Sequence, residues 1–199
     1  MSRRSLSYES IMKTAIKLVE QKGFNNFSLR ELAAELQVQP SSLYNHIRGI
    51  NEIQKAVGLY GIHEMEKGLT EASRGRSMEQ ALKKMALWYR DYAKNNPELY
   101  QAVIGLQMSE DEELKNALKR IVAPIIRVIS EKVKEKEHII HFERAFRSML
   151  HGFISLEMTG YMNRLEIGPE DSFLFMVEQF IDSIGKEGES SGRQGVRTL

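Results

Sequence analysis

The chain has 199 residues, of which 42% are hydrophobic and 28% charged, with a net charge of +1, and it contains no cysteine. This composition indicates a globular protein of one or two small domains and excludes a polycation, disulfides and thiolate metal sites. The basic start MSRRSLSYES is not followed by an apolar signal segment, and no run approaches about 18 apolar residues, so we expect a cytoplasmic protein without a membrane span.

The pattern of apolar residues along the chain is helical. Apolar residues recur at spacings of three and four, and few segments alternate in twos, which predicts an all-α protein of about nine helices. Gly23 ends the first helix, Ser28 and Glu31 form a capping box at the second, and Pro40 suits the first turn of the third. The first four helices are predicted at 7–21, 28–36, 40–46 and 51–73.

The remaining helices follow a break at Arg74–Ser77. Pro124 is expected to kink one of them. The Gly- and Ser-rich end of the chain lacks periodicity, which predicts a flexible tail at 186–199. The five helices are predicted at 77–95, 97–107, 109–134, 138–162 and 169–184.

The second and third helices have the dimensions of a helix-turn-helix motif. Ala33 is small where two helices approach closely, and apolar residues face a core against the first helix. Residues 1–60 also carry 8 Lys/Arg against 5 Asp/Glu, which suits a nucleic-acid module. The polar residues left outward on the third helix, which can exchange hydrogen bonds with base edges and phosphates, are Gln39, Ser41, Ser42, Tyr44, Asn45 and His46. The spacing alone does not separate this interpretation from an ordinary polar surface.

The segment from Ile11 to Phe24, followed by SLRELAAELQVQPSSLYNHI, resembles the tetracycline-repressor-like (TetR) family of transcriptional regulators. The resemblance implies a helix-turn-helix DNA-binding domain at 1–50 and a helical ligand-binding and dimerisation domain at 51–185. It implies that Ser28 caps its helix and binds phosphate, that Tyr44, His46 and Arg48 contact phosphates, and that bases are read by Gln39, Ser41, Ser42 and Asn45. Arg3 and Arg4 are candidates for a minor-groove arm.

Two positions depart from the family pattern. Gln37 stands where the family usually places the turn glycine, so we expect either that a non-glycine residue accepts a left-handed conformation at a cost of ~1 kcal/mol or that the turn differs slightly. Ile50 stands where the family commonly has a lysine that meets phosphate. One phosphate contact is therefore expected to be missing, or to be supplied by Arg48.

The C-terminal part resembles a subgroup of the family named for a Trp-His-Gly signature. The similar stretches are 86–100, which contains Trp88, and 145–153, which contains His151-Gly152. Methionine and aromatic side chains suit an adaptable apolar ligand pocket, although the same residues would also serve as plain core. The predicted lining is Met85, Trp88, Tyr92, Tyr100, Met108, Phe146 and Met149.

The last two predicted helices carry more apolar side chains than one helix stripe buries. Two such helices from each of two subunits would form a four-helix interface, although burial within one chain accounts for part of the set. A dimer would also place two recognition helices about one turn of duplex apart (~34 Å) on a palindrome. The predicted interface residues are Phe142, Phe153, Leu156, Phe173, Met176 and Phe180.

Two other classes of protein compete with this interpretation. Glu135-x-x-His138 matches one unit of a di-iron bundle, but that chemistry requires a second unit and further carboxylates that the chain lacks. Motifs for phosphate-binding or nucleophile loops are absent. A helical scaffold would share the periodicity without needing the polar set around Tyr44. We therefore expect no enzyme, cofactor or metal. The expected protein is a homodimeric regulator, most simply a repressor, of a palindromic DNA operator, controlled by a small apolar or amphipathic effector.

Overall fold

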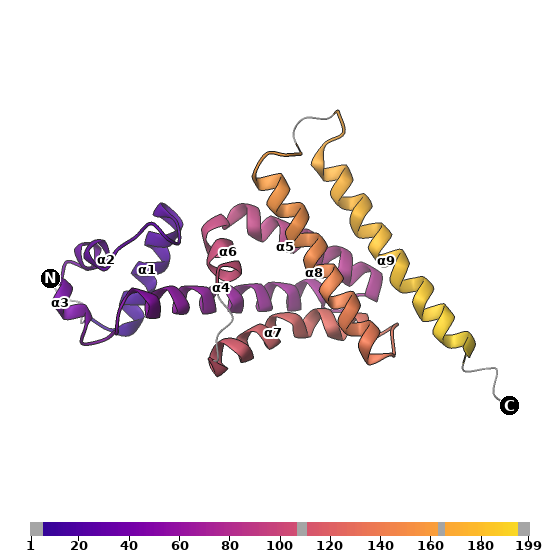
Figure 1. Cartoon of the computed structure of the whole chain (residues 1–199), viewed down its shortest axis with the longest axis horizontal. Coiled ribbons are helices and arrows are strands. Elements are labelled where there is room, and N and C mark those ends of the chain that lie inside the picture. Colours follow the sequence, from indigo (N-terminus) through magenta and orange to yellow (C-terminus); the bar gives the residue numbers. More distant parts are fainter. Residues whose placement is uncertain (1–5, 107–110, 163–165, 195–199) are drawn as a thin grey trace. The chain divides into compact units, whose positions relative to one another are not determined.

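The computed structural model describes residues 6–106, 111–162 and 166–194. Over these residues the regular structure is nine helices, so the predicted all-α class is confirmed (Figure 1). Their bounds are α1 (Tyr8–Lys22), α2 (Leu29–Glu35), α3 (Pro40–Leu43), α4 (Ile50–Ser73), α5 (Met78–Asn95), α6 (Pro97–Ile104), α7 (Glu112–Ile129), α8 (Lys136–Met158) and α9 (Pro169–Gln194).

Several helix ends differ from the prediction, among them those of α6 and α7, which end at Ile104 and Ile129 rather than at 107 and 134. α3 ends at Leu43, and residues 44–46 form a turn, where His46 and Ile47 both donate to the Leu43 carbonyl at 2.8 and 3.0 Å. α8 ends at Met158, because Gly160 adopts a φ of 77° and turns the chain away. α9 continues to Gln194, so the part of the predicted tail at 186–194 is helical. Pro124 lies inside α7 without ending it.

The chain divides into two compact units, one formed by residues 1–64 and 95–117 and the other by residues 65–94 and 118–199. The predicted boundary after residue 50 does not coincide with this division. The difference arises because the first half of α4 and the whole of α6 belong to the N-terminal unit.

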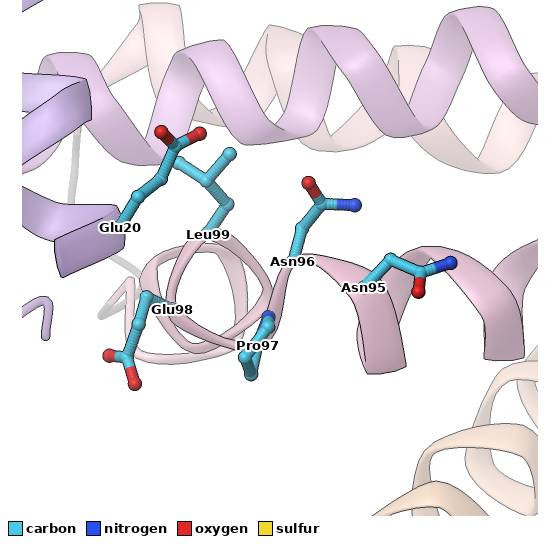
Figure 2. Close-up of a pocket in the computed structure, with 6 residues that line it drawn as sticks. All are labelled: Glu20, Asn95, Asn96, Pro97, Glu98 and Leu99. Atoms are coloured by element: carbon cyan, nitrogen blue, oxygen red, sulfur yellow. The ribbon is translucent and has the colours of Figure 1, made fainter.

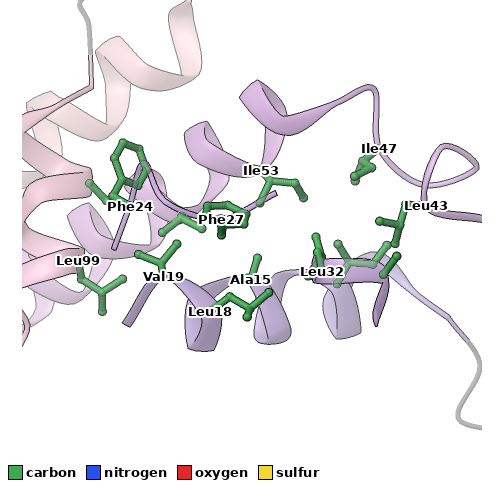
Figure 3. Close-up of a cluster of buried hydrophobic side chains, with 14 residues drawn as sticks. Ala15, Leu18, Val19, Phe24, Phe27, Leu32, Leu43, Ile47, Ile53 and Leu99 are labelled. Atoms are coloured by element: carbon green, nitrogen blue, oxygen red, sulfur yellow. The ribbon is translucent and has the colours of Figure 1, made fainter. Parts of the chain in front are cut away.

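The core of the N-terminal unit joins α1, α2, α3, α4 and α6 (Figure 3). Ile11, Ala15 and Val19 lie on one stripe of α1 and are fully buried, as the spacing of three and four predicts. Leu32 of α2 and Leu43 of α3 are also fully buried in this cluster. The packing therefore seats the two short helices on α1, and neither is long enough to be stable alone.

α6 is held to the α1–α2 connection by packing and by one hydrogen bond. Leu99 and Ala102 are buried in the same core cluster. The Glu98 carboxylate accepts the backbone N–H of Phe24 at 3.1 Å. No local pattern indicates this attachment, because the two residues are 74 positions apart in the chain.

The second unit has its own buried apolar side chains, contributed by α5, α7, α8 and α9 with the second part of α4. Met85, Phe146 and Phe173 are fully buried. Trp88 lies directly over Gly68 of α4, since a Cβ built on that glycine would meet the indole at 1.8 Å. Glycine is thus required at position 68 to admit the tryptophan ring.

Candidate nucleic-acid interface

The start of α2 is fixed by the capping box that the sequence predicts. The Ser28 hydroxyl accepts the backbone N–H of Glu31 at 3.3 Å, and the Glu31 carboxylate accepts the Ser28 backbone N–H at 2.9 Å. The same carboxylate also accepts the Ser28 O–H at 2.8 Å and the Lys22 ammonium at 2.6 Å. The Lys22 hydrogen bond first, and then those from Ser28, lower the pKa of Glu31 to about 2. The Glu31 carboxylate is therefore fully ionised at the start of α2. The hydroxyl proton of Ser28 is already used in the hydrogen bond to this carboxylate.

The turn between α2 and α3 has a left-handed residue, which is the first of the two alternatives that the sequence left open. Gln37 has a φ of 56° and, among the described residues, is the one non-glycine residue with a positive φ. Its N–H donates to the Ala34 carbonyl at 3.0 Å, and the Val38 N–H donates to the Ala33 carbonyl at 2.9 Å. This pair of hydrogen bonds is the Schellman arrangement, which normally has glycine at the left-handed position.

Leu43 and Ile47 anchor α3 and the residues just after it in the core of the N-terminal unit. Leu43 is fully buried and Ile47 is 3% exposed. The predicted DNA-binding side chains lie next to these two residues in the chain. Tyr44 is 60% exposed, and Ser42 is half-buried. The other exposed members of the predicted set are Gln39, Ser41, Asn45, His46 and Arg48.

The start of α4 explains the absence of the family lysine. Ile50 is half-buried and packs against the core cluster, so this position serves packing. The Glu52 carboxylate accepts the Arg48 backbone N–H at 2.8 Å, which leaves the Arg48 guanidinium outside that contact. Arg48 is therefore the one cationic residue of the predicted DNA-binding set that lies next to the start of α4.

Most lysines of the N-terminal unit are paired with carboxylates. Lys17 lies 3.6 Å from Glu35, and Lys22 pairs with Glu31. Lys55 contacts Asp111 at 2.5 Å and Glu113 at 2.8 Å, and these contacts raise its pKa. Within the part of the chain that the structure describes, no ion pair involves Arg30 or Arg48, and both are exposed. Arg30 was missed by the sequence interpretation, although its place at the start of α2 was visible.

The predicted ligand-pocket residues do not all lie in one unit. Tyr100 is buried in the N-terminal unit, whereas Met85, Trp88, Tyr92, Phe146 and Met149 belong to the second. Met108 lies outside the described residues. Trp88 and Tyr92 stack with ring centroids 5.1 Å apart. Both side chains are half-buried, and the Trp88 ring lies over Gly68.

A cavity of about 290 Å³ lies in the N-terminal unit (Figure 2). It is lined by Glu20 of α1 and by the residues around the start of α6. Two carboxylates and two amides give it a polar wall. None of the predicted pocket residues takes part, so this cavity is not the predicted ligand site.

The predicted dimer residues need a correction. Phe173 is fully buried and Phe153 is 8% exposed, and their rings meet edge to face at 5.2 Å within one chain. Both residues are therefore core, and the α8–α9 packing of a single chain explains their presence. Phe142, Met176 and Phe180 are half-buried, and Leu156 is 48% exposed. Exposed apolar residues that were not on the predicted list are Tyr161, Ile167 and Phe175.

Two further observations concern metal binding and membrane insertion. His138 of the Glu135-x-x-His138 unit contacts Glu187 at 2.7 Å. Among residues 6–106, 111–162 and 166–194, no three His, Asp or Glu side chains are grouped in a way that would hold a metal ion. In the same ranges, no helix is both long and apolar enough to cross a membrane.

Comparison with known proteins places this interface in a family. Residues 11–57 match the model "Bacterial regulatory proteins, tetR family", and residues 82–180 match "Tetracyclin repressor-like, C-terminal domain". The HTH-type transcriptional regulator Rv0681 of Mycobacterium tuberculosis is 32% identical over 162 residues, covering 81% of this chain and 74% of that protein. YobS of Bacillus subtilis, also an HTH-type transcriptional regulator, is 30% identical over 155 residues, covering 77% and 80%.

Solved structures have the same fold. A protein from Rhodococcus sp. RHA1 superposes with a TM-score of 0.77 at 17% identity, covering 92% of this chain and 95% of that one. A TetR variant from Acinetobacter baumannii AYE in complex with minocycline superposes with a TM-score of 0.67 at 19% identity, covering 92% and 98%. The chain belongs to the TetR family of helix-turn-helix transcriptional regulators and is not an enzyme. The resemblance to the Trp-His-Gly subgroup remains a prediction.

Proposed function

We propose that this chain is a ligand-responsive repressor that binds a palindromic operator as a homodimer, in the cytoplasm. The observation that carries the DNA-binding part is the exposed polar set around Tyr44, on the short helix α3 and the turn that follows it, which Leu43 and Ile47 anchor in the core. A seated helix with outward donors and acceptors suits entry into a major groove. Ser42 and Asn45 are our preferred base-reading pair, and Gln39 and Ser41 lie beside them.

We assign the phosphate contacts to residues that position the protein on DNA without reading the base sequence. Tyr44 and His46 position the helix, and Arg48 supplies charge beside α4. We add Arg30, because its guanidinium is exposed and has no carboxylate partner among the described residues. Both donors of Ser28, its hydroxyl and its backbone N–H, are directed at Glu31 in this structure, so a phosphate contact by Ser28 requires one of them to leave that carboxylate.

A pair of variants tests the assignment of base and phosphate roles. Asn45→Ala should lose ~1–3 kcal/mol of discrimination at one base position and relax the selected motif there. Tyr44→Phe should weaken binding to all sequences alike, because a phosphate contact is independent of sequence. If Asn45→Ala selects the same motif as the wild type from random DNA, Asn45 does not read a base.

The proposed dimer uses the apolar side chains of α8 and α9 that one chain leaves partly exposed. These are Phe142, Leu156, Met176 and Phe180, together with Phe175, which is 65% exposed. Phe175→Glu should produce monomers in sedimentation velocity. Ile104→Glu is the matched control, because Ile104 is 40% exposed on α6 and should leave the dimer intact.

The effector is proposed to be a small apolar or amphipathic molecule bound in the C-terminal unit. Support comes from its methionine and aromatic side chains and from the related variant that carries minocycline. Binding would release DNA only if the ligand prefers the conformation that does not bind the operator. Trp88 is the sole tryptophan, so effector binding beside it should change the intrinsic fluorescence. A compound that releases DNA without changing this fluorescence would place the effector elsewhere.

A further inference from the structure

One side of the first part of α4 carries three contact positions at intervals of three residues. These positions are Glu52, Lys55 and Gly58, and we call them the α4 stripe. Residues three apart in a helix are neighbours on its surface. Each position of the stripe contacts a different segment of the N-terminal unit, which contains residues 1–64 and 95–117.

The first position of the stripe holds the chain that leads from the recognition segment into α4. The Glu52 carboxylate accepts the backbone N–H of Arg48 at 2.8 Å. Arg48 also lines a surface hollow of about 550 Å³, together with Tyr8, Lys55 and Glu113. Burial raises the pKa of Tyr8 in this hollow, and the charges of Glu52 and Glu113 add to the effect. The predicted phosphate ligand Arg48 and the second position of the stripe therefore share one surface.

The second position of the stripe ties α4 to the start of α7. The Lys55 ammonium donates to the Asp111 carboxylate at 2.5 Å and to the Glu113 carboxylate at 2.8 Å. The Asp111 carboxylate also accepts the backbone N–H of Leu114 at 3.1 Å. The hydrogen bond from Lys55, followed by the one from Leu114, lowers the pKa of Asp111. One ionised carboxylate thus caps the first turn of α7 and binds α4 at the same time.

The third position of the stripe receives a side chain from the residues just after α6. A Cβ built on Gly58 would meet the side chain of Leu106 at 2.6 Å, so this leucine lies directly on the surface of α4. Leu106 is two residues beyond the end of α6 at Ile104. The chain is therefore held against α4 both after α6 and at the start of α7.

We propose that Lys55 is a positioning residue for operator binding, whose contacts with Asp111 and Glu113 fix the start of α4 and thereby the place of Arg48. This inference rests on the proposed operator binding. Glu52 and Lys55 are less than one helical turn apart, so α4 transmits the constraint to the Arg48 backbone. A group that is already held in its binding geometry loses less conformational freedom when it binds.

A purely electrostatic role of Lys55 predicts the opposite result for its two partners. If Lys55 bound a phosphate, neutral residues in place of Asp111 and Glu113 would free its ammonium and remove two repulsive charges, so DNA would bind more tightly. If Lys55 positions α4, the same change releases α4 from α7, and the operator binds more weakly. The direction of the change in affinity therefore separates the two roles.

The test measures the dissociation constant of the operator that the wild type selects from random DNA, at several salt concentrations. The proteins are the wild type, Lys55→Met, Asp111→Asn/Glu113→Gln, the combination of these changes, and the control Glu112→Gln. Asparagine at position 111 keeps an oxygen that can accept the Leu114 N–H. Glu112 is the matched control, because it lies between the two carboxylates but pairs with Lys115 of its own helix at 3.0 Å.

We expect Lys55→Met and Asp111→Asn/Glu113→Gln each to weaken operator binding about threefold to tenfold. The combined variant should bind no more weakly than the weaker of the two, because both remove the same tie. The slope of log affinity against log salt should stay unchanged, since no phosphate contact is lost. Glu112→Gln should stay within about twofold of the wild type.

Circular dichroism and urea unfolding of the same samples separate positioning from folding. A lower unfolding free energy with an unchanged operator affinity would show a purely structural tie and overturn the positioning role. Tighter operator binding by Asp111→Asn/Glu113→Gln, or a salt slope reduced by about 0.9 or more in Lys55→Met, would also overturn it. A wild type that selects no operator would instead contradict the proposed function itself.

Discussion

Replacing Gln37 with glycine is expected to stabilise the N-terminal unit. Gln37 holds a φ of 56° in the turn between α2 and α3. A side chain with a Cβ pays about 1–2 kcal/mol in the left-handed region, whereas glycine adopts it without a clash. Glycine also loses about 0.5–1 kcal/mol more conformational entropy on folding, which opposes the gain. The difference predicts a stabilisation of about 0.5–1 kcal/mol.

The chain contains a second turn with the same hydrogen bonds, which provides a reciprocal control. At the end of α8, Gly160 has a φ of 77°, its N–H donates to the Glu157 carbonyl at 3.0 Å, and the Tyr161 N–H donates to the Leu156 carbonyl at 3.0 Å. Gly160→Gln should therefore lose about what Gln37→Gly gains. Gln37→Ala keeps the Cβ and the unfavourable φ, so it should leave the stability within about 0.5 kcal/mol of the wild type.

Urea unfolding at constant protein concentration, followed by far-ultraviolet circular dichroism, measures all three variants. The slope with urea should be unchanged, because the exposed surface is the same. DNA affinity of Gln37→Gly should also match the wild type, since the turn keeps its conformation. A Gln37→Gly protein that is no more stable than Gln37→Ala would refute the argument from backbone strain.

The remaining predictions concern packing, charge and pH. Gly68→Ala should destabilise the fold by about 1–3 kcal/mol in urea unfolding, because the added methyl overlaps the Trp88 ring; an undisturbed fold would mean that the ring is not confined. Arg48→Gln should reduce the slope of log affinity against log salt by about 0.9, whereas Lys17→Gln, whose ammonium already faces Glu35, should change it less. Hydrogen bonds from Arg90 lower the folded pKa of Glu157, so its stabilisation is present above about pH 4.5 and is lost as pH falls through the folded value. The unfolding free energy of Glu157→Gln should therefore fall less than that of the wild type as the pH is lowered below about 4.5. An equal fall in the two proteins would contradict this.

Local features of the fold were predictable because their causes lie within a few residues. The capping box at Ser28 and the left-handed Gln37 follow from neighbouring side chains and from the length of a turn. The spacing of Ile11, Ala15 and Val19 likewise identifies the buried stripe of α1. These features determine where the exposed set around Tyr44 stands.

Features that depend on distant residues were not predictable. Arg90 donates to Glu157 and Glu170, which are 67 and 80 positions away, and no pattern near it in the sequence indicates them. Phe153 and Phe173 carry the same apolar signal whether they face their own chain or another copy, so the sequence could not show that they pack on each other. The tail differed for a physical reason as well, since glycine and serine lower helix propensity without forbidding a helix.

Selection of bound sequences from a pool of random duplex DNA tests the central proposal most directly. Two seated recognition helices in a symmetric dimer should enrich one inverted repeat, with half-site centres about one helical turn apart (~34 Å). Competition at rising salt should preserve the preference for that repeat while weakening all binding. Recovery of DNA without any enriched inverted repeat would contradict the account of a dimeric operator-binding regulator.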